Sequence, residues 1–157
     1  MEPSDARLRE SIRLAKESGI ALTYQPTDLG DVHPNTVKFI MTTADNHVTT
    51  VQGASIGGGN IEINAINEDA CSFTGAYPTL LISHHDMPGM IAKVTTVLYN
   101  ASINIAFMRV FRQQKGKNAS MIFETDSFIT EEVLCDIRKI DEIESAIAIN
   151  PVEESIE

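Results

Sequence analysis

The order of strand and helix patterns in the second half of the chain is the feature that most constrains the fold. Strands are predicted over 79–83, 104–111, 119–125 and 146–149, and helices over 87–100 and 131–139. Thr130 can cap the second helix, which has Glu131 and Glu132 in its first turn. A βαββαβ order predicts a four-stranded antiparallel sheet with both helices on one face, the ferredoxin-like arrangement of the α+β class.

The first half of the chain predicts one helix followed by an antiparallel meander. Leu8, Ile12 and Ala15 recur at helical spacing over 4–18, where Ser4 can cap the start and Gly19 can close the end. Short strands are predicted over 20–24, 37–41, 48–56, 61–66 and 71–74. Residues 75–78 form a natural joint. We therefore expect one domain over 1–75, a second over 78–151 and an acidic tail over 152–157.

The segment Ser-His-His-Asp-Met-Pro-Gly-Met-Ile at 83–91 predicts a strand that turns directly into a helix. Asp86 is placed to cap that helix, Pro88 suits its first turn, and Gly89 allows close approach to the backbone. Free N–H groups at a helix start attract a carboxylate, and an acidic side chain beside them can meet an ammonium group. The segment therefore predicts either a socket for a free amino acid or a capped helix start without a ligand.

Charge and cysteine content exclude several classes of function. A net charge of −10 argues against partners that are nucleic acids or anionic membranes, because phosphates need an excess of Lys and Arg. No apolar run approaches the ~20 residues that span a bilayer, and the first residues do not resemble a secretory signal. Cys71 and Cys135 match no metal spacing, so we expect no metal site and a reduced, cytoplasmic chain.

A sheet covered by helices on one face only leaves its other face bare. A unit of about 80 residues buries little surface by itself. Pairing with a second copy is the usual solution, so we expect a homo-oligomer formed through the second domain.

Residues 79–151 resemble an ACT domain, a regulatory module that binds amino acids. The resemblance depends on His-Asp-Met-Pro-Gly-Met-Ile at 85–91, on Ile-Asn-Ile at 103–105, and on the βαββαβ order around them. It implies a ligand site made by Asp86 and Gly89 of one copy and Asn104 of a neighbouring copy. Residues next to these positions complete the predicted site: Met87, Met90 and Ile105.

The first half extends the resemblance. Val-His-Pro-Asn-Thr at 32–36 and Gly-Ala-Ser-Ile-Gly-Gly-Gly-Asn-Ile-Glu-Ile at 53–63 are similar to the beta chains of bacterial iron–sulfur L-serine dehydratases. Those chains join an allosteric-substrate-binding (ASB) domain to an ACT domain. Their upstream Gly-Pro-Ser-Ser-Ser-His-Thr motif does not occur here, so we expect the distal half of an ASB domain followed by a complete ACT domain.

The resemblance implies a regulatory or structural beta subunit. An alpha chain with a four-iron four-sulfur cluster would convert serine to pyruvate and ammonia, while this chain would bind L-serine or another amino acid. We expect this chain to hold no cofactor, to contribute no catalytic residue and to be inactive alone. Ser55 lies beside glycines but not in a Gly-x-Ser-x-Gly elbow.

Within the first half, the resemblance predicts a second ligand site made by His33, Asn35 and the three glycines Gly57, Gly58 and Gly59. The same residues also suit plain turns, because His precedes Pro and three glycines favour a hairpin. A phosphate-binding loop is excluded, since no Lys-Ser/Thr follows the glycines and a strand rather than a helix comes next.

Four other polar residues have simpler interpretations. His84 and His85 point to opposite faces of a strand, where packing or solvent is the expected environment. Arg109 and Arg112 lie on a strand that could reach an anionic group, but surface or interface charges are the favoured interpretation.

Two other functions stay open. The chain could be an ACT sensor that signals to another partner, or a regulatory fragment of a phosphoglycerate dehydrogenase, whose long forms carry related domains. Against the second stands the lack of a Rossmann glycine pattern that opens a helix.

Overall fold

A computed structural model describes residues 5–67, 69–112 and 116–151 of the chain. These residues fall into two compact parts, one over 5–32 and one over 33–151. The second part contains two sheets. The strands of one precede the predicted joint at 75–78 in the sequence, and the strands of the other follow it. Among the described residues, no helix has the length and apolar character that crossing a membrane requires.

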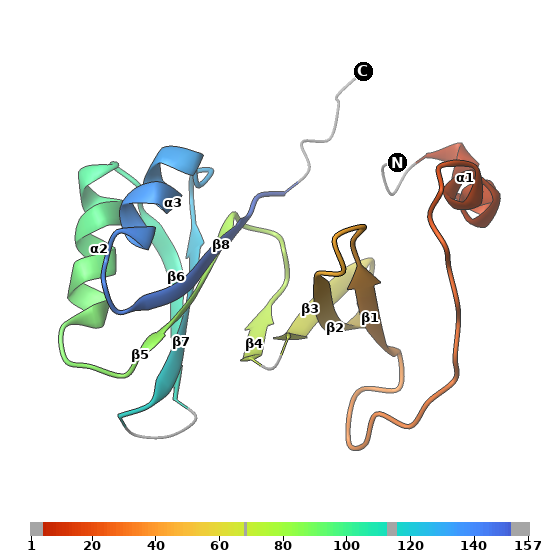
Figure 1. Cartoon of the computed structure of the whole chain (residues 1–157), viewed down its shortest axis with the longest axis horizontal. Helices are drawn as coiled ribbons and strands as arrows, with labels where there is room; N and C mark the ends of the chain where they lie inside the picture. The colour runs from red at the N-terminus through yellow and green to blue at the C-terminus, as the bar shows by residue number, and fades with distance from the viewer. Residues whose placement is uncertain (1–4, 68, 113–115, 152–157) are drawn as a thin grey trace. The chain divides into compact units, whose positions relative to one another are not determined.

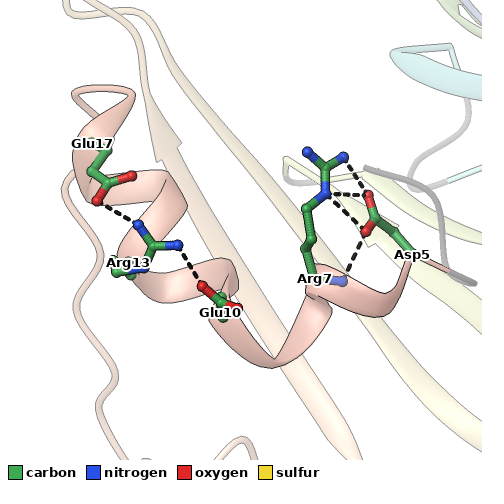
Figure 2. A network of polar contacts seen from close by, with 5 residues as sticks. All are labelled: Asp5, Arg7, Glu10, Arg13 and Glu17. Atoms are coloured by element: carbon green, nitrogen blue, oxygen red, sulfur yellow. Dashed lines mark hydrogen bonds and ion pairs between the residues drawn. The ribbon is translucent and has the colours of Figure 1, made fainter.

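The part over 5–32 begins with a short 3₁₀ helix, η1 (Ala6–Glu10), which continues into helix α1 (Ser11–Glu17). Asp5 caps this start, because its carboxylate accepts a hydrogen bond from the backbone N–H of Arg7 at 2.8 Å and also pairs with the Arg7 guanidinium. Figure 2 shows that pair and a second one in which Arg13 bridges Glu10 and Glu17. The predicted cap Ser4 lies outside the described residues.

The end of α1 follows the prediction, but the strand expected after it does not form. Gly19 has a φ of +79°, and the N–H of Ile20 donates to the carbonyl of Ala15, which closes the helix. Residues 20–24 are not a strand, and Leu22 and Tyr24 are exposed. A strand exists only where another strand accepts its hydrogen bonds, and no described segment pairs with this one.

The first sheet is the predicted antiparallel meander. Its strands are β1 (Thr36–Thr42), β2 (Val48–Gly57), β3 (Asn60–Ile66) and β4 (Asp69–Phe73), in the order β1-β2-β3-β4. The β2–β3 connection contains Gly57, Gly58 and Gly59, all at positive φ. The predicted hairpin is therefore confirmed, and its left-handed backbone explains why glycine occupies it.

The second sheet has the predicted ferredoxin-like topology (Figure 1). Its elements are β5 (Thr79–His85), α2 (Met90–Asn100), β6 (Ile105–Arg112), β7 (Asn118–Thr125), α3 (Glu131–Arg138) and β8 (Ile143–Ile149). The strand order is β6-β7-β5-β8, and all paired strands are antiparallel. Thr130 caps α3 as expected, because its side chain accepts from the N–H of Val133.

The main hydrophobic core lies between this sheet and its two helices. Leu80, Ile82 and Phe123 point from the strands into that core, opposite Val94 and Leu98 of α2. These five side chains are almost completely buried. Alternation along β5 therefore fixes which side chains of the strand reach the helices.

The opposite face of the second sheet is not bare, which corrects one expectation. Leu81 and Ile122 on that face belong to a second apolar cluster with Cys71 and Phe73 of β4. Arg109, also on that face, donates to the carbonyl and Oγ of Ser72 in β4. The first sheet covers only part of this face, because Phe107 and Ile147 on it are still 52% and 42% exposed, so the homo-oligomer stays a prediction.

Candidate functional site

A pocket opens where α2 begins, beside the edge strand β6. Its volume is about 500 Å³, which lies within the range of small-molecule sites. The lining residues come from the end of β5, the start of α2 and the end of β6: His84, Asp86, Met87, Pro88, Gly89, Met90, Ile91, Ala92, Val110 and Arg112. The pocket therefore gathers the predicted ACT-site residues of the 86–90 segment.

Asp86 lies in this pocket but does not cap α2, which corrects the expected role. Its Oδ2 accepts the backbone N–H of Gly116 at 2.8 Å, and its Oδ1 accepts Nη2 of Arg112 at 2.9 Å. Its own N–H donates to the carbonyl of Lys117 at 2.7 Å. The hydrogen bond from Gly116 and the nearby Arg112 guanidinium lower the pKa of the Asp86 carboxyl below its ordinary value. The ionised Asp86 side chain therefore links the end of β5 to Arg112 at the end of β6 and to Gly116 just before β7.

Helix α2 begins later than predicted, at Met90 instead of Met87. Gly89 is its N-cap with a φ of +91°, and no side chain caps the first turn. Pro88 accordingly precedes the cap and does not occupy the first turn. Because Gly89 has no side-chain acceptor, the first backbone N–H groups of α2 keep their partial positive charge beside the pocket.

The two methionines of the segment differ in their surroundings. Met87 is half exposed, whereas Met90 is 2% exposed and packs in the helix–sheet core. Met87 is thus accessible at the mouth of the pocket, and Met90 fixes the position of the helix start against the sheet.

Asn104 and Ile105 do not line this pocket within one chain. Asn104 directly precedes β6, whose other end is Arg112, roughly 25 Å away for a strand of this length. Its Nδ2 donates to Oδ2 of Asp126 at 2.6 Å, and its carbonyl accepts from the N–H of Asp126. Ile105 is half buried and packs against the core.

His84 is a pocket residue that the interpretation from sequence missed. It is 3% exposed, and its Nδ1 lies 2.7 Å from the carbonyl oxygen of His85. A carbonyl only accepts, so Nδ1 carries a proton, and Nε2 is an acceptor whenever the ring holds no second proton. Among residues 5–67, 69–112 and 116–151, that buried Nε2 has no hydrogen-bond partner. The available signal was the alternation of Leu80, Ile82 and His84, which predicts that all three face the helices.

Arg112, for which the sequence left contact with an anionic group open, also lines the pocket. The register pairs Arg112 with Ala119, and Ala119 with His84, so the three residues form one row across β6, β7 and β5. Arg112 is 56% exposed and lines the pocket, so it combines accessibility with a fixed partner, Asp86. The sequence did not show that Arg112 shares a row with His84, because that row depends on strand pairing.

The predicted residues of the first half lie together, away from this pocket in sequence and in fold. His33 Nδ1 accepts from the N–H of Asn35 at 3.2 Å, which describes a local turn before β1. Asn35 and Ser55 exchange hydrogen bonds at 3.3 and 3.5 Å, so the turn adjoins the end of β2 and the Gly57–Gly58–Gly59 hairpin. The side chains of His33 and Asn35 are exposed.

Across the described ranges, no three His, Cys, Asp or Glu side chains are grouped as a metal ion requires. The pocket at α2 is accordingly described by its hydrogen-bonding groups. It offers a free acceptor, a guanidinium and a positive helix end.

Comparison with known proteins identifies relatives of both halves. Residues 78–142 match the model of the ACT domain. The chain is 35% identical over 139 residues to the "Probable L-serine dehydratase, beta chain" of Bacillus subtilis, covering 88% of this chain and 63% of that protein. It is 32% identical over 146 residues to the "L-serine dehydratase, beta chain" of Peptoniphilus asaccharolyticus, covering 92% and 66%.

A weaker similarity extends to another enzyme. The "D-3-phosphoglycerate dehydrogenase" of Bacillus subtilis is 29% identical over 143 residues, which cover 87% of this chain and 26% of that protein. The resemblance to serine dehydratase beta chains inferred from sequence is thus confirmed. The chain spans just under two thirds of the length of the beta chains it matches.

Proposed function

We propose that this chain, whose residues 78–142 are an ACT domain, serves as the regulatory part of an L-serine dehydratase beta subunit. Similarity to two proteins named as such beta chains over about nine tenths of the chain supports this assignment. Similarity of this extent includes both sheets. We assign 1–75 to part of an ASB domain and 78–151 to the ACT domain.

The pocket at the start of α2 is the observation that carries the ligand assignment. A zwitterionic amino acid needs an acceptor for its ammonium group and donors for its carboxylate. The unpartnered Nε2 of His84 is such an acceptor, and the helix start with Arg112 provides such donors. We therefore propose L-serine or a related amino acid as the ligand, with Asp86, Met87, Gly89 and Met90 in the walls.

A second copy of the chain would complete this site. Asn104 and Ile105 lie outside the pocket of their own chain, whereas the ACT resemblance places the Asn-bearing segment against a neighbouring copy. We therefore propose a homo-oligomer, on the ground of this divided site.

A separate alpha chain would carry out the dehydration, with its four-iron four-sulfur cluster as the Lewis acid. Clusters of this type are held by four cysteines, and this chain has two, Cys71 and Cys135. Its own residues therefore do not fit the cluster. We propose instead that this chain binds an amino acid and associates with the alpha chain. We place this complex in the cytoplasm.

His33, Asn35 and the glycine hairpin form a second proposed ligand region, in the ASB part. Their exposed side chains and shared position at the ends of β1 and β2 support this role. A ligand there would contact backbone of the hairpin, where glycine leaves the N–H and C=O groups accessible.

Co-expression with the alpha chain of the same genome tests the subunit assignment. We expect the two chains to copurify and serine dehydration to require both. Activity that is unchanged when this chain is omitted, together with failure to copurify, would overturn the assignment.

Calorimetric titration of the chain with each of the twenty amino acids tests the ligand assignment. We expect heat from L-serine or a close analogue. Binding of an amino acid without copurification would favour the stand-alone sensor, and binding of none would remove the ligand assignment.

A further inference from the structure

We infer that Arg112 binds the carboxylate of the ligand and that Asp86 acts as a positioning residue, through Arg112, without contacting the ligand itself. This inference rests on the proposed amino-acid site. It assigns the orientation of the ligand, with the carboxylate at Arg112 and the ammonium group at His84.

The hydrogen bonds and the low exposure of Asp86 together favour an indirect role. Two of the roughly four acceptor sites of its carboxylate are used, one by the N–H of Gly116 and one by Arg112. Its side chain is only 13% exposed, against 56% for Arg112. A ligand that enters the pocket therefore meets the guanidinium before it meets the carboxylate.

Arg112 retains the donors that a carboxylate needs. A guanidinium has five N–H groups, and Asp86 receives its hydrogen bond from Nη2. The planar fork of Arg suits bidentate binding of a carboxylate. Held by Asp86, this fork is oriented before a ligand arrives, which reduces the entropy lost on binding.

The row across the sheet provides room for the ligand. Arg112 and His84 are separated by Ala119 on the strand between them, so their backbones are about 10 Å apart. Ala119 between them is buried and has only a methyl side chain, and both Arg112 and His84 line the pocket. A carboxylate at Arg112 and an ammonium at Nε2 of His84 then fit one small zwitterion.

Arg109 is the matched control for Arg112. Both lie on β6, but Arg109 is three residues earlier and therefore faces the opposite side of the sheet, where it binds Ser72. Substitution of Arg109 removes the same charge from the same strand without touching the pocket.

The test compares L-serine with L-serinamide, which keeps the ammonium and hydroxyl groups but lacks the carboxylate. Dissociation constants for the full chain are measured by calorimetry and, for weak complexes, by ligand-observed NMR. Should another amino acid be the one that binds, that amino acid and its amide replace the pair.

We expect Arg112→Gln to weaken serine binding about 10- to 100-fold, as loss of a charged hydrogen bond does, and to leave serinamide unchanged. Arg109→Gln should change neither. Asp86→Asn should weaken serine about 2- to 10-fold, because Arg112 must then be ordered on binding, and again leave serinamide unchanged. The double variant should bind serine as Arg112→Gln does, since Asp86 acts only through Arg112.

Three outcomes would overturn the inference. Serine affinity that is unchanged in Arg112→Gln would remove Arg112 from the site while the proposed function stands, because the unmodified chain still binds serine. Equal losses of serine and serinamide in Asp86→Asn would show that Asp86 contacts the ammonium group directly. Absence of binding of any amino acid by the unmodified chain would refute the proposed ligand and this inference together. Circular dichroism of each variant verifies that it is folded.

Discussion

The two sheets of residues 33–151 are both four-stranded and antiparallel, yet they bury their side chains very differently. On β1 the apolar residues Val37, Phe39, Ile40 and Met41 are between 47% and 68% exposed. In the second sheet and its helices the exposed fraction falls to zero at many positions: Leu80, Val94, Leu98, Met121, Phe123 and Ile137.

The difference arises from the connections between the strands. In the second sheet, α2 and α3 follow β5 and β7 and pack back onto one face. In the first sheet the connections are short, and the described residues between β1 and β4 form no helix that could cover either face. Two four-stranded antiparallel sheets therefore differ in burial. The one with helical connections has a helix–sheet core, and the one with short turns has an exposed edge strand, β1.

The largest expected effect on stability comes from replacing the same residue type, phenylalanine, in each sheet. Phe123→Ala removes a fully buried ring and should lower the free energy of unfolding by about 3–5 kcal/mol. Phe39→Ala removes a ring that is 53% exposed and should cost less than about 1 kcal/mol. Urea denaturation followed by far-UV circular dichroism measures both, and equal losses would contradict the contrast in burial.

A glycine substitution examines packing within the first sheet. A Cβ on Gly53 would lie 2.8 Å from Cδ1 of Ile63 and 3.0 Å from the carbonyl oxygen of Glu62. Gly53→Ala should therefore destabilise the chain by about 1–3 kcal/mol through overpacking between β2 and β3. Thermal denaturation checks this value. A neutral effect would mean that this sheet is packed as loosely inside as it is at β1.

A second glycine substitution, in the second half, tests backbone conformation instead of packing. A Cβ on Gly89 would meet no atom within 4 Å, but φ is +91° there. Gly89→Ala should cost about 1–2 kcal/mol from the left-handed conformation alone. The same melting experiment applies, and a loss larger than that of Gly53→Ala would reverse the expected order.

A smaller effect separates the two helices of the second half. Thr130 caps α3 through its side chain, whereas α2 begins at Gly89 without a side-chain cap. Thr130→Ala should therefore cost about 1 kcal/mol, as loss of an N-cap usually does. Thr130→Ser, which keeps the hydroxyl, should recover most of the loss in urea denaturation, and failure of that recovery would locate the cost elsewhere.

The smallest expected effect is a pH dependence at Asp86. Its folded pKa lies below the ordinary 3.8 because Gly116 and Arg112 bind the ionised form. The stabilisation is complete above that ordinary value and is lost as the pH falls through the lowered pKa. The melting temperature of Asp86→Asn should therefore lie below that of the unmodified chain near neutral pH, and the gap should narrow below about pH 4.

Arg112→Gln refines this last prediction. It removes one of the two partners of Asp86 and leaves the N–H of Gly116 in place. Its melting curve should show an intermediate pH dependence. A gap between Asp86→Asn and the unmodified chain that stays constant into acid would show that the carboxylate does not stabilise the fold through its charge.

Local patterns in the sequence determined most of the second half. The βαββαβ order and the cap at Thr130 follow from neighbouring residues, and so does the turn at Gly57–Gly58–Gly59 in the first half, because propensity, capping and positive φ are local properties. Residues 86–91 of the motif line one pocket, since the residues of one turn lie close together whatever their partners are.

Only the tertiary structure decided the roles of the residues in that pocket. Asp86 is bound by Arg112 and Gly116, 26 and 30 positions later in the chain, so it ties strands together where the sequence predicted a helix cap. The free acceptor of His84 likewise depends on burial by distant segments. Residues 20–24 remain outside any sheet, because a strand requires a partner that its own residues do not specify. In each of these cases the partner lies far away in the sequence, so the local pattern does not determine which hydrogen bonds form.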